Sequence, residues 1–223
     1  MPLGLGSGLW GVVLPIAETN IQTNPSFEFG TAGVGVLQSA AVGTSSAFQR
    51  AGAWSLAVTP NSNGTSGAFM GTWVTGNGTA YSVGAWINAA VGVPMIMAIG
   101  SNNGLGLTGG SVTFTGGGTW QWYGCGTVEA AAGTKSVVIR KTSGNSQAIF
   151  YVDAVQVAPW SDGTLRTTTY VDGDQPGCQW LGAQHASQSS RDGQYRGGGS
   201  IVALADIGLS VDQFTGAGMP PLE

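Results

Sequence analysis

Short runs in which apolar residues alternate with small or polar ones fill the chain from about residue 20 to residue 158, and glycine-rich turns separate them. In the run 81–88, the odd positions hold Tyr, Val, Ala and Ile, and Ser, Gly, Trp and Asn stand between them. A period of two gives a β-strand one inner and one outer face. No stretch keeps a helical period for three turns, so the sequence predicts an all-β fold.

The candidate strands follow one another at the spacing of a β-sandwich, with turn signals such as Asn63-Gly64 and Asn77-Gly78 between them. Besides 81–88 they are 54–58, 111–115, 119–125, 135–141 and 147–157. We predict a jelly-roll β-sandwich over residues 20–158, preceded by an N-terminal arm, 1–19. The loop-rich extension that follows, 159–223, contains an apolar run at 201–211, predicted to return as a strand, and has a proline-rich end.

Charged residues make up 8% of the 223 residues, against about 25% in typical soluble proteins. Apolar chains with so little charge usually bury surface in an assembly, which favours a subunit of a symmetric homo-oligomer. The formal net charge of -4, with seven scattered Lys and Arg residues, argues against binding to nucleic acid. The apolar stretches 10–17 and 91–99 each contain a proline and are shorter than the roughly 20 residues of a membrane span. No membrane partner is therefore expected.

The residues that usually carry catalysis are sparse. Cys125 and Cys178 stand far apart in the sequence, and His185 is the sole histidine, so a zinc site is not expected. The two cysteines are compatible either with a disulfide or with two free thiols. No nucleophile elbow and no pair of carboxylates in an apolar cleft is recognisable near His185 or elsewhere. The sequence therefore predicts a protein that is not an enzyme.

Two carboxylates lie among apolar residues in predicted strands. Asp153 shares its expected strand face with Tyr151, Val155 and Val157, which predicts that it is at least half buried. Glu28 stands between two phenylalanines near the start of the fold. A buried carboxylate needs donors or a cation, and oxygen ligands suit calcium. We predict a structural calcium at Glu28 and Asp153 as the one candidate cofactor; the alternative is that both accept backbone or hydroxyl hydrogen bonds.

Four segments resemble the carbohydrate-binding jelly-roll superfamily that includes xylan- and glucan-binding modules. They are Asn24-Pro-Ser-Phe-Glu28, Gly52-Ala-Trp-Ser-Leu-Ala-Val58, Tyr81-Ser-Val-Gly-Ala-Trp86 and Phe150-Tyr-Val-Asp-Ala-Val155. The resemblance covers residues 20–158. In that family a structural calcium commonly lies near the opening Glu and the closing Asp, which correspond to Glu28 and Asp153.

Tryptophans are the candidate glycan-binding residues, because flat aromatic rings suit the apolar faces of sugar rings. Trp120 and Trp122 are two residues apart and share one strand face, and Trp86 is a further candidate. The alternative for all three is packing in the core of the sandwich.

The segment Thr169–Arg191 resembles one found in minor tail and tail-tip proteins of long-tailed bacteriophages, after a jelly roll of this type. The closing Gly216–Pro221 resembles the joint to a further tail module. An aromatic residue with an arginine is a common composition of interface hot spots. A docking loop is therefore predicted, and the alternative is a self-contained loop folded over the sandwich. Its candidate interface residues are Asp172, Asp174, Trp180, His185 and Arg191.

Together these features give two hypotheses of different class. The first is a structural protein of a phage virion, in the tail, tail tip, fibre or decoration layer, assembled in the host cytoplasm and packed against other virion subunits. Adsorption to a host-surface glycan would be compatible with that role. The second is a carbohydrate-binding module that recognises a cell-surface or plant glycan.

Overall fold

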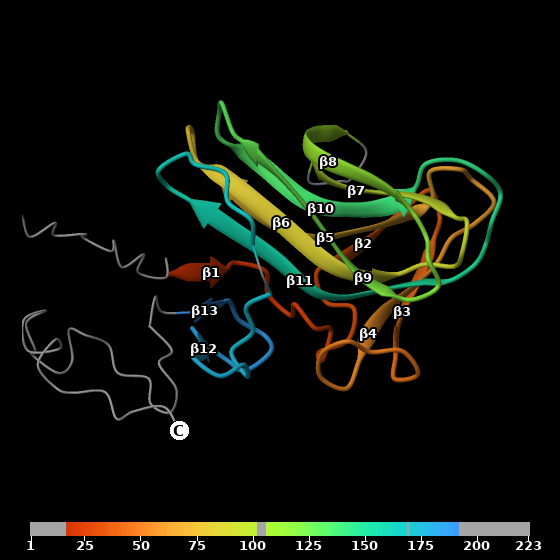
Figure 1. Cartoon of the computed structure of the whole chain (residues 1–223), viewed down its shortest axis with the longest axis horizontal. Helices are drawn as coiled ribbons and strands as arrows, with labels where there is room; N and C mark the ends of the chain where they lie inside the picture. The colour runs from red at the N-terminus through yellow and green to blue at the C-terminus, as the bar shows by residue number, and fades with distance from the viewer. Residues whose placement is uncertain (1–16, 102–105, 169, 192–223) are drawn as a thin grey trace, which may run out of the picture. The chain divides into compact units, whose positions relative to one another are not determined.

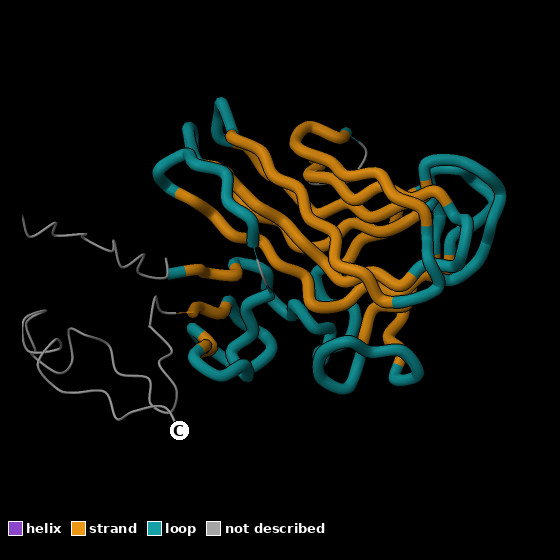
Figure 2. Tube along the Cα trace, viewed as in Figure 1, coloured by secondary structure: helices purple, strands orange, loops and turns teal. Residues whose placement is uncertain are grey.

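The computed structural model describes residues 17–101, 106–168 and 170–191, and the described chain is built from strands and loops without a helix (Figure 2). Correspondingly, the described residues contain no helix long and apolar enough to cross a membrane. The sequence-based prediction of an all-β sandwich is confirmed. Most of arm 1–19, the apolar run 201–211 and the proline-rich end lie outside the described residues.

Two antiparallel five-stranded sheets pack face to face (Figure 1). The first sheet has the order β2 (Val34–Leu37), β5 (Gly67–Thr75), β10 (Gly133–Lys141), β7 (Pro94–Ser101), β8 (Leu107–Thr115). The second sheet has the order β3 (Ala41–Ser45), β4 (Ser55–Thr59), β11 (Phe150–Trp160), β6 (Ala80–Asn88), β9 (Trp120–Val128). Apart from the consecutive pairs β3–β4 and β7–β8, neighbours in each sheet come from distant parts of the sequence, as crossing connections between two layers require.

The core lies between the sheets and follows the predicted alternation. On β6, Tyr81, Val83, Ala85 and Ile87 all belong to the buried apolar cluster. Their neighbours Ser82, Gly84, Trp86 and Asn88 lie on the outer face, as the period of two requires. The opposite sheet contributes the fully buried methionines and branched side chains of β7 and β10.

The register of β11 contains an irregularity that the alternation did not predict. Its pairing with β6 shifts between Asp153 and Gln156, and Ala154 has a φ of 53°. This β-bulge inserts one residue and reverses the faces that follow. Val155 and Val157 therefore enter the core, whereas Asp153 lies on the outer face, and the expectation that the three share a face is wrong.

A small third sheet joins the start of the described chain to its end. It consists of β1 (Glu18–Asn20), β13 (Ser189–Arg191) and β12 (Cys178–Trp180). The buried side chain of Asn20 ties it to the bulged strand: its Nδ2 donates to Val155 O at 2.9 Å and to Val171 O at 3.1 Å. Its Oδ1 accepts from Val157 N at 3.0 Å. The described part of the extension is thus fastened to the sandwich beside the bulge.

Candidate functional site

The three predicted tryptophans lie together on the outer face of the second sheet. Trp86 of β6 stands directly opposite Trp122 of β9, with ring centroids 5.9 Å apart in an edge-to-face arrangement. Trp120 lies two residues along β9 on the same face, opposite Asn88. All three are partly exposed and lie outside the buried core.

The loop before β4 covers one part of this face. The guanidinium of Arg50 lies 4.3 Å from the ring centroid of Trp86, which is the geometry of a cation–π contact. Phe48 stacks on Tyr151 of β11 with centroids 4.6 Å apart. These contacts occupy Trp86 and Tyr151, so that Trp120 and Trp122 remain the more available aromatic surfaces.

Glycines shape the sheet next to Trp122. Gly84 of β6 has no side chain because the indole takes that space: a Cβ on Gly84 would come within 2.2 Å of Trp122 Cζ2. Gly124 and Gly126 follow Trp122 on the outer face of β9, opposite Gly84 and Ser82 of β6. The outer face therefore changes within one strand from tall indoles to the exposed backbone of Gly124, and at Gly126 to a position covered by Leu165.

A groove of about 440 Å³ lies over this part of β9. Trp122, Gly124 and Gly126 line it from β9, Ser82 lines it from β6, and Leu165–Thr168 line it from the segment after β11. We name that segment, residues 161–168, the strap. The volume falls within the range of about 300–1,000 Å³ that is common for ligand sites.

The strap is held in place by specific contacts. The Ser82 hydroxyl donates to Arg166 O at 2.6 Å and accepts from Trp160 Nε1 at 3.1 Å. The Arg166 guanidinium pairs with Asp162 and lies 4.8 Å from the Trp160 ring centroid. Neither the strap nor the glycines are among the site residues predicted from the sequence. The signal available was the change on β9 from two tryptophans to two glycines at a spacing of two residues.

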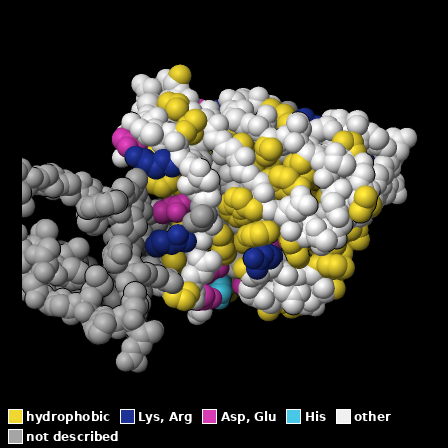
Figure 3. Space-filling model, in the orientation of Figure 1, with side chains coloured by type: hydrophobic (Ala, Val, Ile, Leu, Met, Phe, Trp, Pro, Cys, Tyr) yellow, Lys and Arg dark blue, Asp and Glu magenta, His cyan; other side chains and the backbone are white. Residues whose placement is uncertain are grey.

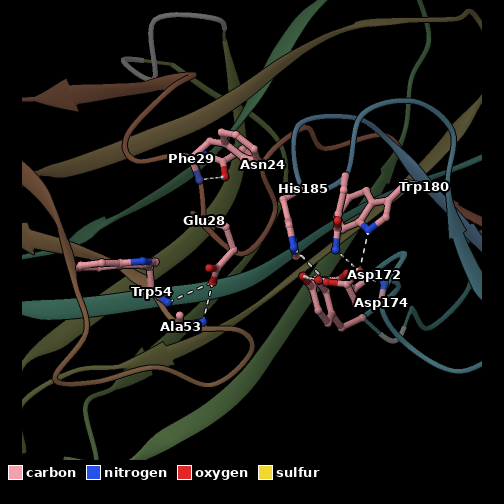
Figure 4. A network of polar contacts seen from close by, with 11 residues as sticks. Asn24, Glu28, Phe29, Ala53, Trp54, Asp172, Asp174, Trp180 and His185 are labelled. Atoms are coloured by element: carbon pink, nitrogen blue, oxygen red, sulfur yellow. Dashed lines mark hydrogen bonds and ion pairs between the residues drawn. The ribbon is translucent and has the colours of Figure 1, made fainter.

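The predicted calcium residues, Glu28 and Asp153, both accept hydrogen bonds from the backbone of residues 50–54. Asp153 Oδ2 accepts from Arg50 N at 2.7 Å and from Ala51 N at 2.9 Å, and Asp153 Oδ1 accepts from Ala154 N. Glu28 Oε1 accepts from Ala53 N at 2.7 Å and from Trp54 N at 3.0 Å (Figure 4). These N–H contacts correspond to the hydrogen-bonding alternative. Calcium stays a prediction, in which the two carboxylates would supply oxygen ligands.

The electrostatics of Asp153 follow from its position. The carboxyl is completely buried, and this burial raises its pKa from 3.8 to about 7. The hydrogen bonds from Ala51, Arg50 and Ala154 oppose the shift, and the charge of Glu28 adds to it. Asp153 is therefore the group in this region whose protonation changes near neutral pH.

The five candidate docking residues lie in or next to the small third sheet. Asp174 accepts from Trp180 Nε1 at 3.0 Å and pairs with His185 Nε2 at 3.0 Å (Figure 4). Asp172 accepts from Asp174 N at 3.0 Å, as in an aspartate-initiated turn. Each of the residues Asp172, Asp174 and His185 brings a potential metal-ligand atom within 4.8 Å of the others. Arg191 donates to Tyr170 O at 2.9 Å. The segment is thus strongly bonded to itself, which is the arrangement of the self-contained alternative.

Both cysteines are free thiols. Cys125 points inward from β9, and burial raises its pKa to about 12. A thiol that remains protonated is a poor nucleophile.

A scan against protein-family models finds no match, and a search of curated proteins finds no significant relative. Solved structures do match. The fold is similar to part of the arabinose-bound α-L-arabinofuranosidase MgGH51, with a TM-score of 0.51 and 12% identity over 65% of this chain and 27% of that one. It is also similar to the CBM22-1 xylan-binding domain of Paenibacillus barcinonensis Xyn10C, with a TM-score of 0.48 and 12% identity. The match covers 63% of this chain and 92% of that domain. A tailspike protein of bacteriophage CBA120 matches with a TM-score of 0.48 and 14% identity. This match covers 63% of this chain and 21% of the tailspike chain. At such identities the likeness concerns the fold alone, a jelly-roll β-sandwich.

Proposed function

We propose that this chain is a non-catalytic carbohydrate-binding module that holds a glycan in the groove beside Trp122. The observation that carries the proposal is the outer face of β9, where Trp120 and Trp122 are followed by the exposed backbone of Gly124 and by Gly126, over which Leu165 of the strap lies. An aromatic wall beside a low floor accommodates a sugar ring, because the ring's C–H face can stack on the indole while its edge rests over the sheet.

Polar groups at the edges of the groove suit sugar hydroxyls. The strap contributes the exposed Thr167, whereas the hydroxyl of the buried Thr168 is already bonded to Glu18, and Arg166 lines the same part of the groove. Arg166 is already neutralised by Asp162, so the groove has no uncompensated charge from this pair. We therefore infer a neutral glycan. The xylan-binding domain and the arabinose-bound enzyme with similar folds make xylan and arabinan the first polysaccharides to test.

The test is affinity gel electrophoresis of the whole chain through xylan, arabinan and β-glucan, followed by titration calorimetry with the corresponding oligosaccharides. We expect retardation in at least one gel, lost in Trp122→Ala and reduced in Trp120→Ala. The control is Trp54→Ala, because Trp54 is an exposed tryptophan outside the groove. Equal retardation of all three variants would refute the groove as the site, and no retardation of the wild type on any glycan would refute the function.

A second candidate function, a structural subunit of a phage virion, is supported by the sequence of residues 169–191 and by the described surface. The face shown in Figure 3 carries few charged side chains, and several of the chain's charged groups are buried, among them Lys141 and Asp153. Large apolar side chains such as Phe29, Val74 and Val91 are exposed. A surface of this kind suits burial between subunits.

Electron microscopy of the purified chain distinguishes this role. A virion subunit is expected to form ordered rings, fibres or arrays, whereas an isolated binding module remains monomeric. Monodisperse monomers at high protein concentration would contradict the virion proposal and leave the glycan proposal unaffected.

A further inference from the structure

A second groove, of about 320 Å³, lies at the edge of the sandwich, away from the residues that line the Trp122 groove. It is formed where the chain leaves β1 and runs beside β5. Gln22 and Thr23 line it from the first segment, Gly71–Val74 line it from β5, and Gln188 lines it from the loop before β13. None of its lining residues is charged.

Two of the residues that line this groove carry buried polar atoms that have no hydrogen-bond partner. Gln22 is 4% exposed and Trp73 is 8% exposed, and the atoms concerned are Gln22 Oε1 and Trp73 Nε1. One is an acceptor and the other a donor. Buried polar atoms in folded proteins are almost always paired with protein, water or a ligand, so two unpaired atoms beside one groove make it a candidate ligand site.

The backbone is shaped around the Gln22 amide. Gln22 Nε2 donates to Thr23 O at 2.7 Å, which fixes the orientation of the amide and leaves Oε1 directed at Gly71. A Cβ on Gly71 would lie 1.9 Å from Oε1, and Gly71 has a φ of 60°. The positive φ favours glycine at position 71, and the absence of a Cβ leaves room for the end of the Gln22 side chain.

We propose that this groove binds a single neutral sugar ring, with one hydroxyl accepting from Trp73 Nε1 and the same or a neighbouring hydroxyl donating to Gln22 Oε1. A hydroxyl is the simplest group that both accepts and donates, and the hydroxyls of Thr23 and Thr72 offer further partners. The volume of about 320 Å³ lies at the lower end of the range of about 300–1,000 Å³ that is common for ligand sites, so a single sugar ring fits. A free monosaccharide and the terminal residue of a glycan share this chemistry.

The inference does not depend on the Trp122 groove, because the two sites share no residue. The experiment is titration of the whole, ¹⁵N-labelled chain with xylose, arabinose, galactose and glucose, and with their oligosaccharides, monitored through the indole N–H signals. The Trp73 signal is identified by its proximity to the Tyr81 ring, whose centroid is 6.0 Å away. We expect at least one sugar to shift this signal saturably, both in the wild type and in Trp122→Ala. A response to oligosaccharides alone would identify a chain terminus as the ligand, and a response to the free sugar a monosaccharide site.

Gln22→Met removes the acceptor and is expected to weaken this response at least about tenfold, the equivalent of one hydrogen-bonding interaction. Gln147→Met, an exposed glutamine in a loop, is the matched control. If Gln22→Met does not fold, the titration of the wild type still tests whether the groove binds a sugar. A Trp73 signal that no sugar shifts, or that moves without saturation together with every other indole signal, would overturn the proposal. So would a bound-water cross-peak on Trp73 that persists at the highest sugar concentration.

Discussion

The indole of Trp122 on β9 occupies the space that a side chain on Gly84 of β6 would fill, with Cζ2 2.2 Å from the Cβ position. The two strands are neighbours in the second sheet, and residue 84 lies opposite residue 124. Gly84 thus determines how low Trp122 lies over the sheet, and with it the wall of the groove.

Replacing Gly84 by alanine therefore displaces the indole, because the contact is far shorter than any real Cβ approach. We expect Gly84→Ala to lower glycan affinity by an amount comparable to Trp122→Ala, and to lower stability by about 1–3 kcal/mol through overpacking. Calorimetric titration and denaturant unfolding measure the two effects. The matched control is Gly43→Ala on β3, where an added Cβ meets no atom within 4 Å. Unchanged affinity in Gly84→Ala would show that Trp122 does not form the wall.

Stability is expected to depend on pH through Asp153. Its pKa is about 7 in the folded chain and near 3.8 in the unfolded chain, so between these values the folded state holds a proton that the unfolded state releases. The contribution of Asp153 to the free energy of unfolding is therefore greatest below about pH 4 and falls by about 1.4 kcal/mol per pH unit at most, until it levels off above about pH 7.

Urea unfolding at about pH 5 and at about pH 8 measures this effect, with Asp153→Asn as the reference because an amide does not titrate. The free energy of unfolding of the wild type, relative to that of Asp153→Asn, should be lower at about pH 8 than at about pH 5. A difference that stays constant, or that changes in the opposite direction, would show that the three N–H donors keep Asp153 ionised.

Chelation separates the two hypotheses for Glu28 and Asp153. If a resident calcium is held by these carboxylates, a chelator lowers the melting temperature, because a ligand that binds the folded state stabilises it. Added calcium then restores the melting temperature in the wild type and not in Glu28→Gln. If the five backbone N–H groups are the partners, the melting temperature is the same with chelator and with calcium. The second result would remove calcium from the description of this protein.

Much of the second sheet could be predicted from the sequence, because a period of two is a local property. The inner residues of β6 and the shared face of Trp120 and Trp122 both follow from it. The β-bulge at Ala154 could not be predicted in this way, since a single inserted residue leaves the apolar content of the strand unchanged.

The groove itself depends on contacts between distant segments. Trp122 faces Gly84 only because β9 pairs with β6 in one particular register, and the strap reaches the sheet through a bond from Ser82 to Arg166. No local pattern in the sequence specifies either contact. The sequence therefore indicated the stacking tryptophans of the candidate site, but neither the glycines beside them nor the strap, residues 161–168, on its far side.

Asn20 is expected to be the residue that fastens the extension to the sandwich. Its amide donates to Val155 and Val171 and accepts from Val157, so it joins β1 and the chain after residue 170 to the bulged strand. Asn20→Leu keeps a similar volume but leaves these backbone groups buried without partners, which should cost about 2–5 kcal/mol. The loss should appear first as faster proteolysis within residues 161–191, because the sandwich retains its own core. Asn145→Leu, in an exposed loop, is the control. Uniform loss of the whole fold in Asn20→Leu, without earlier cleavage of the extension, would instead show that the third sheet and the sandwich unfold as one unit.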